Sequence, residues 1–263
     1  MNYSSGLEYV IRSSYTHSYS NVNYFSRHSV DDNYNLGIEN PTVFENQYRG
    51  NAPTAKYNKS QLNYLSSYPA SHQFTPEIFL NPSRPKTRFI GDSSEAKRIA
   101  EEVFELMIKA KLPENISINI LPFHDFKVLH SMFGAWSNGI LGFSLNGANK
   151  QVFVRENNLD ALMLVLGHEI GHVLTDLLPN KHDEEAKAFA FSVEWAGIIK
   201  KHNVANLGLS IKDDFGFQPA RNGLHDVAFG FVDFMVSKGR TAMELHDDLA
   251  RKYVSVFNII YPK

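Results

Sequence analysis

The spacing of apolar residues changes several times along residues 92–203, and each change predicts a different element. Apolar side chains recur every three or four positions after Asp92, which begins a stretch with the spacing of a capping box, and they stop before Pro113. A helix is therefore expected between these two residues. Residues 116–120 then alternate between apolar and polar, which is typical of a half-buried strand.

The next segment predicts a loop followed by a hairpin. Residues 123–138 are rich in aromatic side chains but show no regular period, so we expect a loop packed on the domain. Residues 139–145 and 151–155 have the character of strands and lie on either side of Asn146 and Gly147. This dipeptide is typical of a tight turn, and the two strands are expected to pair.

Residues 159–178, LDALMLVLGHEIGHVLTDLL, are apolar on most sides and predict a buried helix with Asn158 as its N-cap and Pro179 beyond its end. Three polar side chains interrupt this apolar surface and form an HExxH motif. Two histidines four residues apart lie on one helix face and can bind a single zinc ion, while the glutamate between them points toward the zinc-bound water. Zinc would give these buried polar groups the partners that they need. The motif consists of His168, Glu169 and His172.

A second helix is expected over residues 183–201 and should pack antiparallel against the motif helix, because the loop between them is short. Gly167 and Gly171, which each disfavour a helix by about 1 kcal/mol relative to alanine, indicate that a neighbouring element lies close. The first turn of the second helix carries Glu184 and Glu185. Either carboxylate would complete a His-His-Glu site that leaves one zinc position open for water.

The C-terminal part, residues 204–263, is expected to be mainly helical. Residues 215–223 predict a loop, and His225 precedes an apolar segment over residues 227–236. A second capping-box spacing begins at Thr241 and predicts a helix that continues to about residue 257.

The N-terminal third has a different composition, since 10 of the 12 tyrosines lie in residues 1–72. One interpretation is a weakly ordered extension. The other is a prosegment or docking arm that wraps the following domain, because tyrosine side chains are suited to lining surfaces. A connector containing Pro76, Pro82 and Pro85 indicates a boundary, so we expect an extension over 1–91, a core over 92–203 and a C-terminal subdomain. Four residues of the extension have side chains suited to covering a zinc site, although each alone is more typical of a surface: His17, His28, Asp31 and Asp32.

Composition narrows the class of protein. The 263 residues are 43% hydrophobic and 21% charged, as in an ordinary globular protein, and the net charge of -2 gives no indication of a nucleic-acid partner. The absence of cysteine limits a metal site to histidine and carboxylate ligands. No signal peptide and no apolar run of membrane-spanning length is evident, so we expect a cytoplasmic protein without a membrane partner.

Residues 92–202 resemble the gluzincin class of zinc metallopeptidases through HEIGH followed by EEAKAFAF. The order of elements is similar to that of the small archaeal minigluzincins, and the Glu-Ala pair is similar to that of ImmA/IrrE-type peptidases. The resemblance implies an α+β fold with a zincin-like core made of a small mixed sheet, the HExxH helix and a glutamate helix. It also implies that His168, His172 and Glu185 bind one Zn²⁺ and that Glu169 is the general base.

Two further features follow from the resemblance. Many gluzincins have an aspartate four residues after the ligand glutamate, where this chain has Phe189. Asp176 is an alternative partner for the site, although its position is more typical of an exposed residue at a helix end. A downstream His or Tyr often stabilises the oxyanion in this class, which makes His225 the first candidate and Tyr253 the second.

The expected function is hydrolysis of peptide bonds in a peptide or protein substrate. The strand at residues 139–145 resembles the edge strand along which zincins pair an extended substrate, which favours an endopeptidase. Self-inhibition by the N-terminal segment would make the protein a latent zymogen. The alternatives are a non-catalytic zinc-binding regulatory or interaction protein, and an enzyme that hydrolyses a non-peptide amide.

Overall fold

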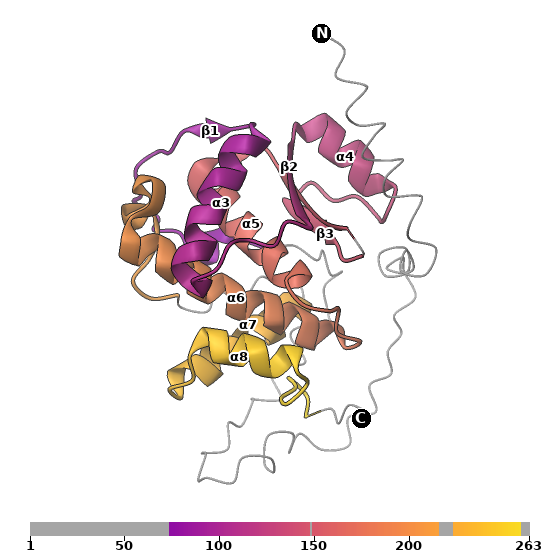
Figure 1. Ribbon diagram of the computed structural model, residues 1–263, viewed down its shortest axis with the longest axis vertical. Coiled ribbons are helices and arrows are strands. Elements are labelled where there is room, and N and C mark those ends of the chain that lie inside the picture. The colour runs from indigo at the N-terminus through magenta and orange to yellow at the C-terminus, as the bar shows by residue number, and fades with distance from the viewer. Residues whose placement is uncertain (1–73, 148, 216–222, 259–263) are drawn as a thin grey trace.

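The computed structural model describes residues 74–147, 149–215 and 223–258, and the expectations for residues 1–73 and for the loop at 216–222 lie outside this part of the chain. These residues form an α+β fold, as expected, with small sheets and six α-helices among them (Figure 1). The strands are β1 (Phe89–Ile90), β2 (Ile116–Leu121), β3 (Gly142–Leu145), β4 (Lys150–Arg155) and β5 (Asn157–Asn158). The helices are α3 (Ser93–Ile108), α4 (Phe123–Ser131), α5 (Leu159–Val173), α6 (Lys181–His202), α7 (Leu224–Ser237) and α8 (Ala242–Ala250).

The larger sheet is mixed and has the strand order β2-β4-β3. β2 runs parallel to β4, and β3 runs antiparallel to it with Leu145 opposite Gln151, which confirms the predicted hairpin. β3 is therefore an edge strand. A separate pairing of β1 with β5 places Phe89 opposite Asn158, immediately before α5 begins.

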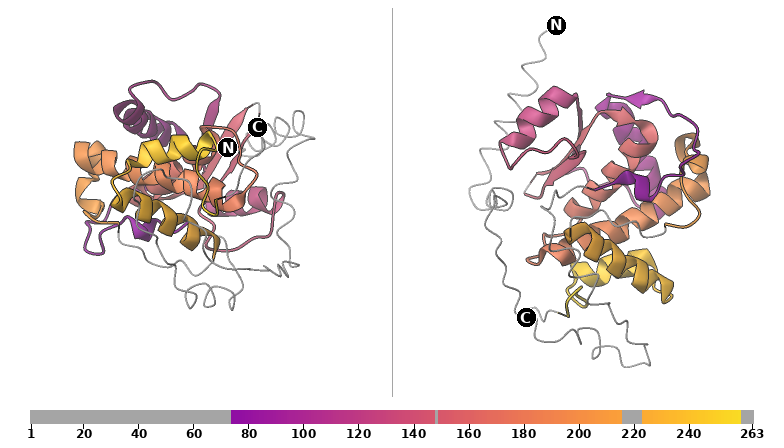
Figure 2. Two further views of the ribbon diagram at one scale, coloured as in Figure 1. Left: turned by 90° about the horizontal axis from the view of Figure 1, so that it is seen from below. Right: turned by 180° about the vertical axis from the view of Figure 1, so that it is seen from behind.

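Helix α5 lies between the mixed sheet and α6, and α7 and α8 pack against α6 on its other sides (Figures 1 and 2). Its glycines mark close approaches, as the sequence predicted. A Cβ atom added to Gly167 would lie 2.5 Å from the Trp195 ring, and one added to Gly171 would lie 3.0 Å from the backbone of Ala188. On the sheet side, a Cβ atom on Gly142 would lie 2.9 Å from the Glu169 side chain. These contacts bring α6 and β3 directly against the HExxH motif.

Residues 74–91 pack into the same core as the elements that follow them. Phe79 and Leu80 are fully buried, and Leu80 forms an isolated bridge with Ile211. Further along, Arg84 and Thr87 contact Asp160 at the start of α5. The edge of the packed core therefore does not coincide with the expected boundary at residue 92.

Two local predictions were wrong. The stretch expected to be a loop, residues 123–138, contains α4, which buries Phe126 and Leu129 against the outer face of the sheet. With only nine residues, this helix is too short to show a clear period. Helix α8 ends at Ala250 rather than near residue 257, because Lys252 adopts a positive φ of 63° that a helix cannot continue through.

The predicted helix starts were more accurate. The Asp92 side chain accepts hydrogen bonds from the N–H groups of Ser94 and Glu95, and the capping box at Thr241 is complete. Asn158 occupies the N-cap position of α5, but its side chain forms no capping hydrogen bond. Among the described residues, no helix combines the length and the apolar character that a membrane crossing requires.

Candidate metal centre

The two histidines of the HExxH motif lie one turn apart on the face of α5 that meets α6. Their imidazole rings are 4.8 Å apart between centroids and nearly perpendicular. His168 is buried, and His172 is 15% exposed. Both Nε2 atoms point toward the same place, where a carboxylate of α6 lies between them.

That carboxylate belongs to Glu185, in the first turns of α6. Asn180 caps the helix by accepting hydrogen bonds from the N–H groups of His182 and Asp183, and this fixes which side chains face α5. The Oε2 atom of Glu185 lies 3.4 Å from Nε2 of His168 and 3.7 Å from Nε2 of His172. The structure therefore brings together the three residues that the sequence singled out as metal ligands.

A third imidazole reaches the same point from α7. The Nε2 atom of His225 lies 3.0 Å from Oε2 of Glu185, and one ligand atom each from His168, Glu185 and His225 lies within 4.8 Å of the others. His225 was predicted as an oxyanion-stabilising residue, and its position beside the candidate ligands is compatible with that role. It is equally compatible with a role as a ligand.

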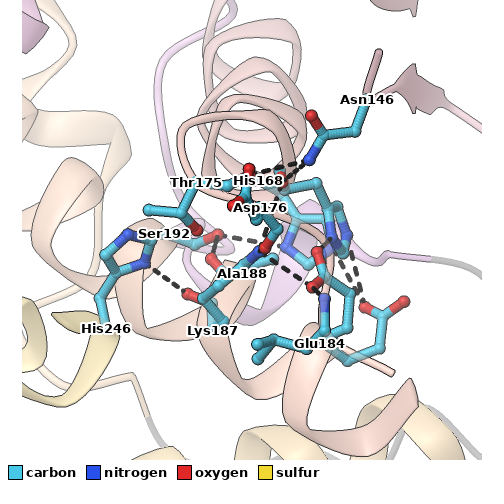
Figure 3. Close-up of polar contacts among 12 residues, drawn as sticks. Asn146, His168, Thr175, Asp176, Glu184, Lys187, Ala188, Ser192 and His246 are labelled. Carbon is cyan, nitrogen blue, oxygen red and sulfur yellow. Dashed lines mark hydrogen bonds and ion pairs between the residues drawn. The ribbon is translucent and has the colours of Figure 1, made fainter. Parts of the chain in front are cut away.

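The tautomers of the two α5 histidines are set by the partners of their Nδ1 atoms. Ser192 donates its hydroxyl proton to the Ala188 carbonyl over 2.8 Å, so its oxygen is the acceptor for Nδ1–H of His168 at 3.2 Å. His172 donates Nδ1–H to Oε1 of Glu184 over 2.9 Å (Figure 3). Neutral imidazoles held in this way carry a lone pair on Nε2, the atom that a metal ion binds.

These residues could hold a metal ion. The Oε2 atom of Glu185 is buried without a hydrogen bond of regular geometry, although three imidazole nitrogens lie around it. A buried carboxylate oxygen needs a positively charged partner, and a cation placed among these atoms would supply one. Imidazole and carboxylate ligands are a donor set that zinc accepts.

Without a metal, the charges of the cluster balance through its own groups. Burial would raise the pKa of Glu185, but His225 and His172 hold it well below its usual value. Burial would lower the pKa of His172, but the carboxylates of Glu185 and Glu184 raise it to about 9. Burial lowers the pKa of His168 to about 4. A proton on His172 thus compensates the carboxylates when no cation is bound.

Glu169 faces the sheet side of this cluster. It is 6% exposed, lies against Gly142 of the edge strand β3, and is hydrogen-bonded to the Ser144 side chain. Burial raises the pKa of Glu169 to about 7, and the neighbouring His172 and Ser144 limit the rise. A carboxylate with a pKa near neutrality can both accept and release a proton at physiological pH.

Other candidates from the sequence take different positions. Asp176 is exposed, so it does not serve as a buried partner of the site. Tyr253 is 66% exposed and is not part of the buried group. Phe189 is fully buried, and its ring packs 4.9 Å from that of His168 and 5.8 Å from that of His225.

Three side chains contact the histidines of the site in ways that the sequence did not predict. Ser192 contacts His168 and Glu184 contacts His172, while the Phe74 ring stacks on the His168 ring at 4.3 Å. A hydroxyl 24 positions from its histidine gives no local signal. The Glu184 carboxylate was recognised, but only as an alternative ligand.

Comparisons of this chain with protein-family models, with curated proteins and with solved structures found no match.

Proposed function

We propose that this protein is a zinc-dependent peptidase built on a zincin-like core, with His168, His172 and Glu185 as ligands of one catalytic Zn²⁺. The observation that carries the proposal is the convergence of imidazole Nε2 atoms on a buried Glu185 oxygen, beside a glutamate with a pKa of about 7. A site that only stored metal would have no need of a carboxylate tuned in this way.

The catalytic roles follow from the positions of the side chains. A zinc ion at this site would lower the pKa of a bound water molecule to about 7 and polarise a substrate carbonyl. Glu169 accepts a proton from the attacking water and delivers it to the departing amine. His225, if not a ligand, donates a hydrogen bond to the oxygen that becomes negative.

The edge strand supports a peptide as the substrate. Among the described strands, β3 pairs with β4 alone, and Gly142 brings its backbone against Glu169. An extended peptide that adds to this free edge would place a backbone carbonyl near the catalytic glutamate. Because an edge accepts the middle of a chain as readily as its end, an endopeptidase is favoured.

A second candidate function is a non-catalytic zinc-binding protein. The observation that favours it is the 3.0 Å approach of His225 to Glu185, since a fourth protein ligand would close the tetrahedral site that catalysis needs open. Absorption spectra of the Co²⁺-loaded protein and its His225→Ala variant test this. A four-ligand site changes its spectrum when His225 is removed, whereas a three-ligand site keeps it.

The decisive experiment compares the zinc-loaded wild type with Glu169→Gln on a complex peptide library, with cleavage read by mass spectrometry and zinc measured by elemental analysis. Equal zinc content with cleavage by the wild type alone supports a peptidase. Cleavage by both proteins, or no zinc in either, contradicts the proposal. Zinc in both proteins with no cleavage supports the binding protein, provided that removal of residues 1–73 does not release activity.

The N-terminal segment is proposed to inhibit the enzyme in cis. Phe74, the first described residue, stacks on the ring of His168, so the chain passes beside the proposed metal centre at this position. Latency suits a peptidase placed in the cytoplasm, where an open site would attack the cell's own proteins. Removal of residues 1–73 is expected to raise the cleavage rate, and a rate that falls or stays unchanged argues against inhibition.

A further inference from the structure

We propose that Glu184 and Lys187 form a positioning pair that holds His172 in its metal-binding orientation and ties it to the end of helix α5. This inference rests on the proposed zinc site and adds to it two residues that touch neither metal nor substrate.

Both oxygens of Glu184 are engaged. Oε1 accepts the hydrogen bond from Nδ1–H of His172 over 2.9 Å. Oε2 accepts from the backbone N–H of Leu178 over 2.8 Å and from the Lys187 ammonium over 2.9 Å. The side chain of Glu184 is 2% exposed, so water does not compete for these bonds. A carboxylate held by both oxygens cannot rotate, and it therefore fixes the plane of the imidazole that it contacts.

Lys187 fixes the direction of this carboxylate through an ion pair. Its side chain is fully buried, and its ammonium contacts Glu184, the Asp176 carbonyl at 3.0 Å and the His172 carbonyl at 3.4 Å (Figure 3). The carbonyls lie at or just beyond the C-terminal end of α5, where the helix dipole favours a positive charge. Lys187 thus contacts the backbone of His172 directly, and it acts on the His172 side chain through Glu184.

The arrangement is better explained by positioning than by stability. Removing an ammonium and a carboxylate from water costs more than their attraction commonly returns, so a buried pair is weak evidence of stabilisation. Here the pair lies beside one candidate ligand, and one of its oxygens accepts the Nδ1 proton of that ligand. Such an acceptor fixes the tautomer of the imidazole and makes its Nε2 lone pair a stronger metal ligand. Loss of the acceptor typically lowers metal affinity by about 10- to 100-fold.

The test measures the Zn²⁺ affinity of the full chain by competition with a chromophoric chelator. We expect Glu184→Ala to weaken zinc binding about 100-fold and Glu184→Gln about 10-fold, because the amide oxygen still accepts from His172. The loss of zinc affinity in Lys187→Met should lie between these two values. In this variant Glu184 keeps its hydrogen bond to His172, but its carboxylate is no longer held in one orientation. The absorption spectrum of the Co²⁺-loaded proteins should shift in the Glu184 variants, which a change in stability alone would not produce.

Asp160→Asn is the matched control. Asp160 is another buried carboxylate paired with a cation at helix α5, but it lies at the opposite end of the helix. The Asp160→Asn substitution should lower the unfolding temperature while leaving zinc affinity and the Co²⁺ spectrum unchanged. Circular dichroism of each variant confirms that it is folded, and Glu184→Gln, the mildest change, keeps the test informative if the others unfold.

The outcomes separate the two proposals. A wild-type protein that binds no zinc overturns the proposed function, and this inference with it. A wild type that binds zinc tightly while Glu184→Gln and Glu184→Ala bind it equally well overturns only the positioning pair. A loss of affinity in the control as large as in the Glu184 variants also overturns it, because affinity would then follow stability.

Discussion

The two ends of helix α5 use the same kind of interaction for different purposes. At the N-terminal end, Asp160 accepts hydrogen bonds from Arg84 over 2.6 Å and from Thr87 over 2.7 Å. At the C-terminal end, Lys187 lies against the last carbonyls and pairs with Glu184. Asp160 at the N-terminus and Lys187 at the C-terminus each have the sign of charge that the helix dipole favours at that end.

The two ends differ in which group binds the second oxygen of the carboxylate, Asp160 at one end and Glu184 at the other. The second oxygen of Asp160 binds Thr87 and the N–H of Ala161, which serves the helix start itself. The second oxygen of Glu184 instead accepts the Nδ1 proton of His172. The N-terminal end therefore anchors the preceding chain, whereas the C-terminal end also orients a candidate ligand. Similar burial and charge thus lead to different expected effects on mutation.

The largest effect is expected from His172→Ala. If three or four ligands share a zinc-binding free energy of about 10–16 kcal/mol, the loss of one weakens binding by roughly 10²- to 10⁴-fold. Chelator competition measures this change, and Asp160→Ala, at the other end of the helix, should keep the wild-type affinity. Comparable losses of zinc affinity in both variants would contradict the proposal that only the C-terminal end of α5 acts on the metal site.

Asp160→Ala should give the largest loss of stability. Removal of this buried carboxylate leaves Arg84 and the N–H of Ala161 without their partner, at a cost of about 3 kcal/mol. Urea unfolding of the zinc-free protein measures the change, and Thr87→Val, which removes a single hydroxyl, should cost less. An unchanged midpoint for Asp160→Ala would show that the preceding chain is not anchored here.

Asn146→Ala should have a moderate effect restricted to the C-terminal end. The Asn146 amide donates to the carbonyls of Thr175 at 2.8 Å and His172 at 3.3 Å, which ties the β3–β4 hairpin to the end of α5. Its loss should cost about 1–2 kcal/mol of unfolding free energy. The exposed Asn149 of the same hairpin is the control, since Asn149→Ala should be neutral. Equal unfolding midpoints for the two variants would show that the Asn146 hydrogen bonds do not stabilise the contact between the hairpin and the end of α5.

The smallest effect is a pH dependence that also belongs to the C-terminal end. His246 is fully buried and donates Nδ1–H to the Lys187 carbonyl over 3.1 Å, and burial lowers its pKa below 6.5. Below pH 6.5 the unfolded chain takes up a proton that the folded protein does not, so stability falls as pH decreases, by up to about 1.4 kcal/mol per pH unit. His246→Phe should flatten this slope in zinc-free protein between pH 6.5 and 5. If the dependence of stability on pH is the same in His246→Phe as in the wild type, titratable groups other than His246 cause it.

Much of the frame of the site could be predicted from local sequence. The HExxH spacing places His168 and His172 on one face of a helix wherever that helix forms, and the apolar residues around them ensure burial. Gly167 predicted a close neighbour because a helix interior tolerates glycine poorly without a packing reason, and the Trp195 ring occupies that space. These inferences needed only a helical period of 3.6 residues.

The partners of the site needed the tertiary structure. Glu184 and Glu185 are adjacent, and the sequence left both as possible ligands until the resemblance favoured one of them. On a helix they point about 100° apart, so the way α6 packs against α5 decides which carboxylate reaches the Nε2 atoms and which reaches Nδ1 of His172. The contacts of His225, Ser192 and Phe74 with these groups likewise depend on how distant segments pack, which no local spacing encodes.

The sequence by itself determined that two imidazoles and a carboxylate would lie together on a buried helix, because those positions are related by the geometry of a single element. Only the tertiary structure decided which groups surround them, which Nδ1 acceptors set their tautomers, and how the two helix ends differ. The physical reason is that burial and hydrogen bonding are properties of packed elements, whereas helical periodicity is a property of the chain itself.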